Sequence, residues 1–530
     1  MMEESKKNLA INLMRFPSNG NGESTELITD NANSAIRLYG RRFYKDQTPV
    51  EYLAEFLLAF ASPKQKSREG CYQFKLNTTD DGEIAYYWPE DRIALKLFSF
   101  FSSSKLETRH PAHRQAYLAA LETVKERIGG AKDEQEETLR LIQSLFGGFV
   151  GVAKNRTWVT YSFLPVTTSL LARELNWLHS KATKDKSLRN WESIASYSYF
   201  AHDRHNFMAR GGELLYLQVV NLFAQHDANE ISVLLKEKEY QHLANRMNGL
   251  SIRLEDHLRT MLVESSVQLS CLGDFIEATL DEYKIKLEPK PAYLGWVPIV
   301  SRTEGLLFAM EMDNVCSSNI GTLEKLDLLQ ILCCMQVLRS LCFQARRIDE
   351  TDKYTQGFIG NYAWIVTDPE AILGTPIRQM AQSSFGLIEE LLYRVLKNNT
   401  ILGAGSDTEA EKHGFQIFRK LSKQIGLVVP RKGIGQRFTL HQGLLRFLVA
   451  ALVTPGERIR LTHFYQRVFA HYGIALGGEQ LAVALNWCGN EADGDSYAVS
   501  SSTAWVEEAL QQGGFLVELS DAVSMVKNPG

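Results

Sequence analysis

The eighteen residues from Leu326 to Phe343, "LDLLQILCCMQVLRSLCF", limit most strongly what this chain can fold into. The run is apolar enough to require burial, but four charged or amide side chains interrupt it: Asp327, Gln330, Gln336 and Arg339. A membrane-spanning helix carries few such groups, because each would lie in hydrocarbon. The run therefore predicts a buried core helix, from Thr322 to about Arg347, which needs other helices around it.

Size and composition favour a mainly helical protein with several domains. The 530 residues exceed one ordinary core, and only 14 of them are proline, which favours long helices. A formal net charge of −4 gives no overall attraction to nucleic acid or to an anionic membrane. Because the N-terminus lacks an apolar core long enough for a signal peptide, we expect a soluble, cytoplasmic protein without a membrane contact.

The seven cysteines form no Cys-x-x-Cys pair, so neither a zinc ribbon nor a thioredoxin-type motif is expected. They are Cys71, Cys271, Cys316, Cys333, Cys334, Cys342 and Cys488. Most of them occur in apolar helical patterns, which is typical of buried, reduced thiols in a cytosolic protein. We expect no cofactor.

Changes in composition and pattern predict five segments. These are a partly ordered N-terminal segment (1–46), an N-terminal helical domain (47–290), a central helical domain (291–400), a Gly-rich linker (401–412) and a C-terminal block (413–530).

The N-terminal domain is expected to begin with a helix at "TPVEYLAEFLLAFAS", with Thr48 as its N-cap and Pro49 at its first position. A β-hairpin near residues 72–88 is predicted around the turn Asp81-Gly82. From about Arg92 to Ile285 the pattern predicts helix almost throughout, including "LPVTTSLLARELNWLHS".

The C-terminal block has the element order of a winged-helix-like domain. Helices are predicted at "FTLHQGLLRFLVAALV", "LTHFYQRVFAHYG", "GEQLAVALNW" and "STAWVEEALQQGG". The runs "FLVEL" and "AVSMV" then predict a short hairpin. Several helices followed by a hairpin are typical of the winged helix, although a plain helical bundle with a terminal hairpin has the same order.

Charge is segregated in this block. Between Val468 and Val526 there is no Lys or Arg but there are eight acids, so the last helix would repel a DNA duplex and the hairpin region is expected to contact protein. The cations lie upstream: Arg431, Lys432, Arg437, Arg458, Arg460 and Arg467. This basic segment (430–467) suits nucleic acid or an acidic surface of a partner equally well.

The densest group of reactive side chains is "FAHDRHNFMARGGE", residues 200–213. On a helix, the i, i+3 spacing of His202 and His205, with Asp203, would suit a metal ion in a nuclease or phosphohydrolase. Arg204 and Arg210, beside the helix start at Gly211-Gly212, would suit a phosphate.

A third interpretation of this group is favoured, a polar junction between helices in which Arg210, Asp203 and Glu213 pair. The sequence contains no phosphate loop, zinc-protease motif, nucleophile elbow or kinase motif set. We therefore expect a subunit without catalysis of its own, and no catalytic residue is assigned.

Two stretches, "RHNFMARGGE" at 204–213 and "GGFLVELSDAVSMVKNP" at 513–529, resemble large helical accessory subunits of bacterial antiphage defence systems. The systems in question are of the restriction type that accompanies DNA phosphorothioation or a translocase-like ATPase. This resemblance implies a scaffold or adaptor inside a complex that has an ATPase or nuclease partner and DNA as its target.

Overall fold

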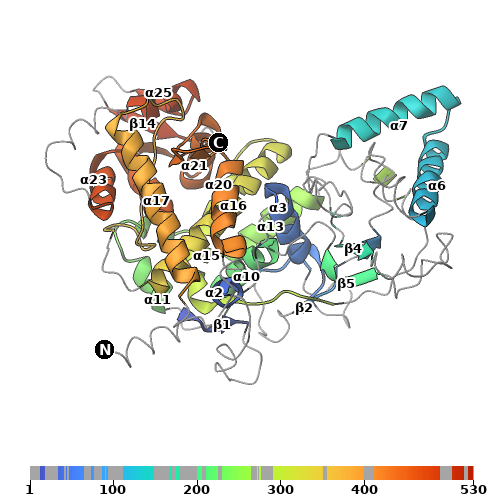
Figure 1. Ribbon diagram of the computed structural model, residues 1–530, viewed down its shortest axis with the longest axis horizontal. Helices are drawn as coiled ribbons and strands as arrows, with labels where there is room; N and C mark the ends of the chain where they lie inside the picture. The colour runs from blue at the N-terminus through green and yellow to red at the C-terminus, as the bar shows by residue number, and fades with distance from the viewer. Residues whose placement is uncertain are drawn as a thin grey trace.

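The computed structural model describes most of the chain. The described ranges, with a few isolated positions besides, are 12–17, 34–40, 47–64, 73–76, 86–89, 91–93, 111–147, 173–177, 200–205, 211–224, 229–263, 291–349, 355–398, 411–489, 504–518 and 523–528. Helices dominate these ranges, so the mainly helical fold class is confirmed (Figure 1).

Helices of very different length occur along the chain. They are α2 (Ser34–Tyr39), α3 (Pro49–Ala61), α6 (Pro111–Ile128), α7 (Lys132–Gly147), α10 (Gly211–Phe223), α11 (Asn229–Leu234), α12 (Gln241–Ala244), α13 (Leu250–Val263), α15 (Arg302–Ser317), α16 (Thr322–Ile348), α17 (Pro376–Leu396), α20 (Gln416–Gln424), α21 (Gln442–Leu452), α22 (Leu461–Tyr472), α23 (Gly478–Trp487) and α25 (Ala504–Gln512).

The described strands are short and form sheets of two or three strands. They are β1 (Arg15–Phe16), β2 (Tyr86–Tyr87), β3 (Asp91–Ile93), β4 (Arg173–Trp177), β5 (Phe200–His205), β6 (Ala292–Tyr293), β7 (Val297–Pro298), β8 (Trp364–Ile365), β9 (Val428–Val429), β10 (Arg437–Phe438), β11 (Arg458–Arg460), β12 (Ile474–Ala475), β13 (Leu516–Glu518) and β14 (Ser524–Lys527). Several pairs, such as β1 with β7 and β8 with β12, join segments far apart in the sequence.

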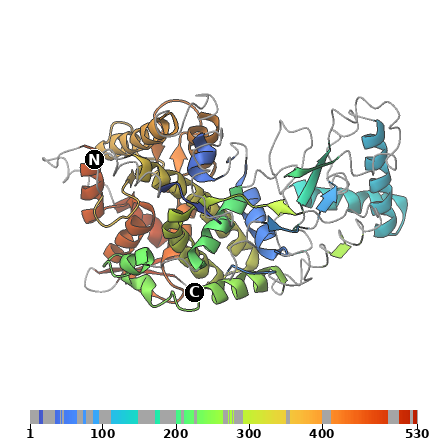
Figure 2. The same ribbon diagram turned by 90° about the horizontal axis from the view of Figure 1, so that it is seen from below.

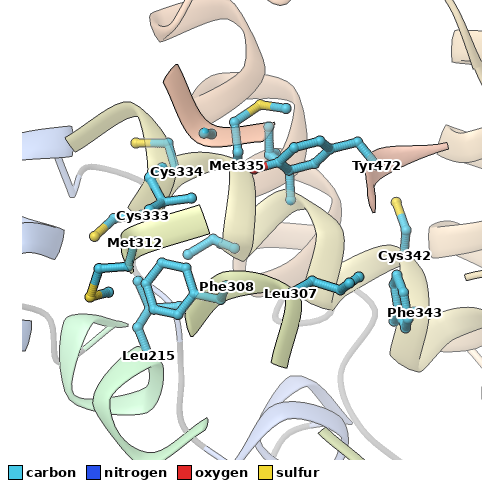
Figure 3. Packing of buried hydrophobic residues seen from close by; sticks show 14 of the residues in the cluster. Leu215, Leu307, Phe308, Met312, Cys333, Cys334, Met335, Cys342, Phe343 and Tyr472 are labelled. Atoms are coloured by element: carbon cyan, nitrogen blue, oxygen red, sulfur yellow. The ribbon is translucent and has the colours of Figure 1, made fainter. Parts of the chain in front are cut away.

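Helix α15 lies at the centre of the helical body, and every residue from Thr303 to Cys316 is buried. It packs against α10, α13, α16 and α21. Figure 3 shows how Phe308 and Met312 of α15 lie among apolar side chains of α10 and α16, including Leu215 and Cys333. The buried apolar residues of the described chain form one connected cluster, which the N-terminal, central and C-terminal segments share.

Helix α16 confirms the prediction made for the apolar run. It is long and apolar enough to cross a membrane, but 89% of its apolar window is buried inside the protein. Arg339, near its middle, is fully buried and pairs with Glu311 of α15. This burial and pairing are those of a core helix.

The carboxylate of Glu311 is the centre of a buried polar network. Arg339 donates two hydrogen bonds to it, from Nη1 at 2.7 Å and from Nη2 at 2.9 Å. His471 contacts it through Nδ1 at 2.7 Å, and the Tyr472 hydroxyl donates to it at 2.8 Å. Burial acts to raise the pKa of Glu311, but the Arg339 guanidinium and the hydrogen bond with His471 outweigh it, so this pKa is lowered. The network therefore holds α15, α16 and α22 together through a charged pair.

His242 lies beside this network, with its ring centroid 5.8 Å from that of His471. Burial, together with the nearby His471 and Arg467, lowers the pKa of His242 from 6.5 to about 3, although Glu457 acts in the opposite direction. At pH values between these two, the unfolded chain binds a proton that the folded protein does not bind. Stability must therefore fall as the pH falls through this window.

We expect the wild-type protein to lose about 1 kcal/mol of stability through His242 between pH 7 and pH 5.5, after allowing for partial solvent exposure of the ring. Urea unfolding at the two pH values measures this loss. A His242→Leu variant, which cannot titrate, should show a smaller loss by about that amount. An equal loss in both proteins would contradict the assignment.

Helices α6 and α7 and the sheet β3–β4–β5 lie to one side of the helical body (Figures 1 and 2). The expectation of helix from Arg92 to Ile285 is wrong in this part, because β4 occupies residues 173–177 and β5 residues 200–205. Strand β4 lies between its two neighbours, parallel to β3 and antiparallel to β5. The run "RELNW" has apolar residues at alternate positions, Leu175 and Trp177, which suits a strand.

The predicted N-terminal hairpin lies mostly outside the described residues, which lack its turn Asp81-Gly82. The described strand in this region, β2, pairs antiparallel with β6. Residues 73–76 lie in a turn. By contrast, the capping of α3 is confirmed, since Thr48 and Glu51 exchange the two hydrogen bonds of a capping box.

In the C-terminal block, helices occur at all four predicted places: α21, α22, α23 and α25. Strands β13 and β14 form the antiparallel pair expected at the chain end. A third strand, β11, pairs with β14 on its other side, so that the sheet order is β11–β14–β13.

Candidate functional site

The reactive group at 200–213 is divided between a strand and a helix. His202, Asp203, Arg204 and His205 lie on β5, Arg210 lies outside the described residues, and Glu213 lies in the first turn of α10. Because successive side chains of a strand point to opposite faces, residues three apart do not share a face. The helical i, i+3 argument for a metal site at His202 and His205 is therefore wrong.

The glycines Gly211 and Gly212 let α10 approach α3 closely. A Cβ on Gly212 would come within 2.1 Å of the Tyr52 carbonyl oxygen, and one on Gly211 within 2.3 Å of the Tyr52 ring. The Gly212 amide donates to the Glu55 carboxylate at 2.7 Å. The helix start thus binds an anion, as expected for such a terminus, but that anion is a buried side chain of α3 and not a phosphate.

Glu213 is also buried and accepts a hydrogen bond from the Tyr87 hydroxyl at 2.6 Å. This contact joins α10 to β2. The predicted pairing of Glu213 with Arg210 and Asp203 stays a prediction, because the side chains of both partners lie outside the described ones.

Four of the described cysteine thiols are buried in the core. Burial raises the pKa of the Cys316 thiol to about 12 and also raises the pKa of Cys333, Cys334 and Cys342. Thiols of this kind are poor nucleophiles and poor metal ligands. Among the described side chains, no three His, Cys, Asp or Glu groups come together as a metal site.

The predicted basic residues fall into two classes. Arg437 is buried and donates to the Pro369 carbonyl at 2.7 Å, and Arg467 pairs with Glu457 through two hydrogen bonds. The remaining four are exposed, and none has an ion pair or hydrogen bond with any side chain of the described chain. They are Arg431, Lys432, Arg458 and Arg460.

Two neighbouring loops carry the most exposed apolar side chains described, and we call residues 369–375 and 430–436 together the two-loop surface. Ile434 is 96% exposed, Leu373 83% and Ile372 76%. The loops are held together where Arg437 binds Pro369 and where Thr367 bridges Thr439. Isolated exposed aliphatics are ordinary, but three at neighbouring loop tips are a feature of interaction surfaces.

An open cleft of about 540 Å³ adjoins the two-loop surface. Pro369 and Arg431 line it from the two loops, and Asp327, Gln330 and Ile331 line it from α16. His441 also lines it, but its ring is fully used, with Nε2 bonded to the Ile425 carbonyl and Nδ1 accepting from the Gly443 amide. The cleft therefore offers an apolar wall with one carboxylate and one guanidinium, and no pair arranged for acid–base catalysis.

Charges of both signs border the two-loop surface. Arg431 and Lys432 are exposed on the second loop, and Glu370 is exposed on the first. Mixed charge around exposed apolar residues resembles the polar rim and apolar centre of protein interfaces. The sequence indicated the two cations but not Ile372 and Leu373, because nothing local shows that their loop packs beside the second one.

A scan against protein-family models and searches of curated proteins and of solved structures found no match.

Proposed function

We propose that this protein is a non-catalytic scaffold or adaptor subunit of a multi-protein complex that acts on DNA through an ATPase or nuclease partner. The two-loop surface carries the proposal. Its exposed aliphatic side chains, with cations on one loop and an acid on the other, suit an apolar segment of a partner protein with polar flanks. A surface that binds a nucleic-acid backbone would instead carry cations, without exposed aliphatic side chains and without an acidic residue.

The use of reactive groups inside the fold supports a structural role. Glu311 and Arg339 neutralise each other in the core, and Glu55 fills the helix start at Gly212. The four buried thiols, with their raised pKa values, lie in the apolar core. These groups are used to hold helices together, which is what a scaffold requires.

The resemblance of residues 204–213 and 513–529 to defence-system accessory subunits supplies the setting, a cytoplasmic bacterial complex directed against phage DNA. We further propose that the C-terminal block is a winged-helix-like docking domain. The succession α21, β11, α22, β12, α23, α25, β13, β14, with β14 in the middle of the sheet, supports this.

The proposal predicts that an ATPase or nuclease is encoded beside this protein's gene and that the two proteins form a complex. Co-expression followed by size-exclusion chromatography and titration should give a stable complex, and a Leu373→Asp, Ile434→Asp double variant should weaken it at least about tenfold, because central apolar contacts dominate interface energies. Ile252→Asp is the matched control, since Ile252 on α13 is 70% exposed and far from these loops in sequence.

Two results would count against the proposal. Equal weakening by the Ile252 variant would show that the two-loop surface has no special role. Cleavage of DNA, or hydrolysis of a nucleotide with a divalent metal, by the isolated protein would instead favour a metal-dependent enzyme.

A further inference from the structure

The outer face of the C-terminal sheet brings together three cations that are separated in the sequence. The register of β11 with β14 places Arg458 opposite Lys527, Ile459 opposite Val526 and Arg460 opposite Met525. Ile459 and Val526 are buried, so the alternate residues Arg458, Arg460 and Lys527 lie on the outer face.

None of these three cations has a hydrogen bond or ion pair with any other side chain of the described chain. The nearest acid in sequence, Glu457, is engaged with Arg467. Directly opposed like charges such as Arg458 and Lys527 destabilise a sheet. An arrangement that costs stability and has no internal partner calls for an external anion.

The acid of α25 that contacts the sheet, Glu507, lies on its other side. Ser524, which points inward from β14, donates to the Glu507 carboxylate of α25. The outer face continues onto β13 at Val517, opposite Met525. A polyanion that approaches the outer face thus meets cations and apolar groups, and the acidic helix α25 is behind the sheet.

We propose that this face, named here the cationic sheet face (Arg458, Arg460 and Lys527), binds the phosphate backbone of duplex DNA without reading its sequence. Arg458 and Arg460 are about 7 Å apart along the strand, and the strands are about 5 Å apart. Because one DNA strand advances about 3.4 Å per phosphate along its axis, such a patch meets about two or three phosphates. This inference deepens the proposed function by giving the scaffold its own hold on the DNA that its partner acts on.

The test uses the full-length protein and a fluorescein-labelled duplex of random sequence, with fluorescence anisotropy measured over a series of KCl concentrations. We expect weak binding at low salt. The logarithm of the affinity should fall linearly with the logarithm of the KCl concentration. In an Arg458→Glu, Arg460→Glu, Lys527→Glu variant, affinity should fall at least about tenfold. The salt slope should decrease by about 2–3, because each phosphate that the protein no longer neutralises lowers it by about 0.9.

An Arg431→Glu, Lys432→Glu variant is the control, because it also replaces exposed, unpaired cations in the same block. It should keep its affinity for the duplex within about twofold, and circular dichroism should show both variants folded. A comparison of the variants separates the two proposals. The Arg458→Glu, Arg460→Glu, Lys527→Glu variant should still bind the protein partner, and the Leu373→Asp, Ile434→Asp variant should still bind DNA.

Three outcomes would overturn the inference. One is wild-type protein that does not bind the duplex at low salt. Another is an equal loss of affinity in the Arg431, Lys432 control. The third is wild-type protein that binds a polyglutamate peptide more tightly than the duplex, together with a sheet variant that no longer shows this preference. That result would assign the face to an acidic protein.

Discussion

A Glu311→Gln variant is expected to lose about 3–5 kcal/mol of stability, because it leaves the Arg339 charge buried without a counter-ion. Both side chains are fully buried, and Glu311 accepts hydrogen bonds from Arg339, His471 and Tyr472. Glutamine keeps the shape but turns an amide group toward donors that need an acceptor. Urea unfolding followed by circular dichroism measures the loss.

Two further variants separate charge from packing in this experiment. Glu390→Gln removes one partner of a surface pair with Arg394, and because Glu390 is 67% exposed we expect less than about 0.5 kcal/mol. A Glu311→Leu, Arg339→Met double variant removes both charges and should recover part of the loss. If Glu311→Gln and Glu390→Gln lose equally little, the buried pair does not stabilise the fold as described.

Gly212→Ala is expected to destabilise the protein by at least about 3 kcal/mol, at the upper end of what overpacking costs. The new methyl group would lie 2.1 Å from the Tyr52 carbonyl oxygen and 2.5 Å from Cβ of Glu55, and a backbone oxygen cannot rotate aside. Relief would need α10 to move away from α3, which would lengthen the hydrogen bond from the Gly212 amide to Glu55. Thermal and urea unfolding both report the effect.

The matched control is Gly386→Ala in α17. Gly386 lies inside the helix, and a Cβ there would meet nothing within 4 Å. Alanine should therefore stabilise the protein by about 0.5–1 kcal/mol through the usual helix preference. A destabilised Gly386 variant, or an unaffected Gly212 variant, would mean that the close approach of α3 and α10 is not what these glycines provide.

Local signals carried the correct part of the fold prediction. The N-cap Thr48 with Pro49 at the start of α3, and the glycine that ends the run of α22, are encoded within a few residues, and each marks a helix end that the structure contains. The apolar run of α16 likewise predicted its own burial. Such features need no knowledge of distant residues.

The features that the sequence did not predict all depend on partners far along the chain. The anion at Gly212 is Glu55, 157 residues away. Lys527 lies opposite Arg458 only because of the strand register. The loops that carry Ile372 and Ile434 are neighbours only because they pack together in the fold. The prediction of helix at β5 is wrong because the pairing of β5 with β4 leaves no signal in the local sequence. The i, i+3 spacing of the two histidines in this segment suits a helix instead. Pairing of this kind is a property of the folded chain.

The burial of α15 on all sides has a consequence for how this protein is made. The hydrogen bond from Asn314 to the Ala451 carbonyl spans 137 residues, and that from Tyr472 to Glu311 spans 161. A ribosome needs on the order of ten seconds to synthesise such a length. During that time the side of α15 that α21 will cover has no partner, and Glu311 has Arg339 of α16 but neither His471 nor Tyr472. The nascent chain must therefore stay soluble until α21 and α22 emerge.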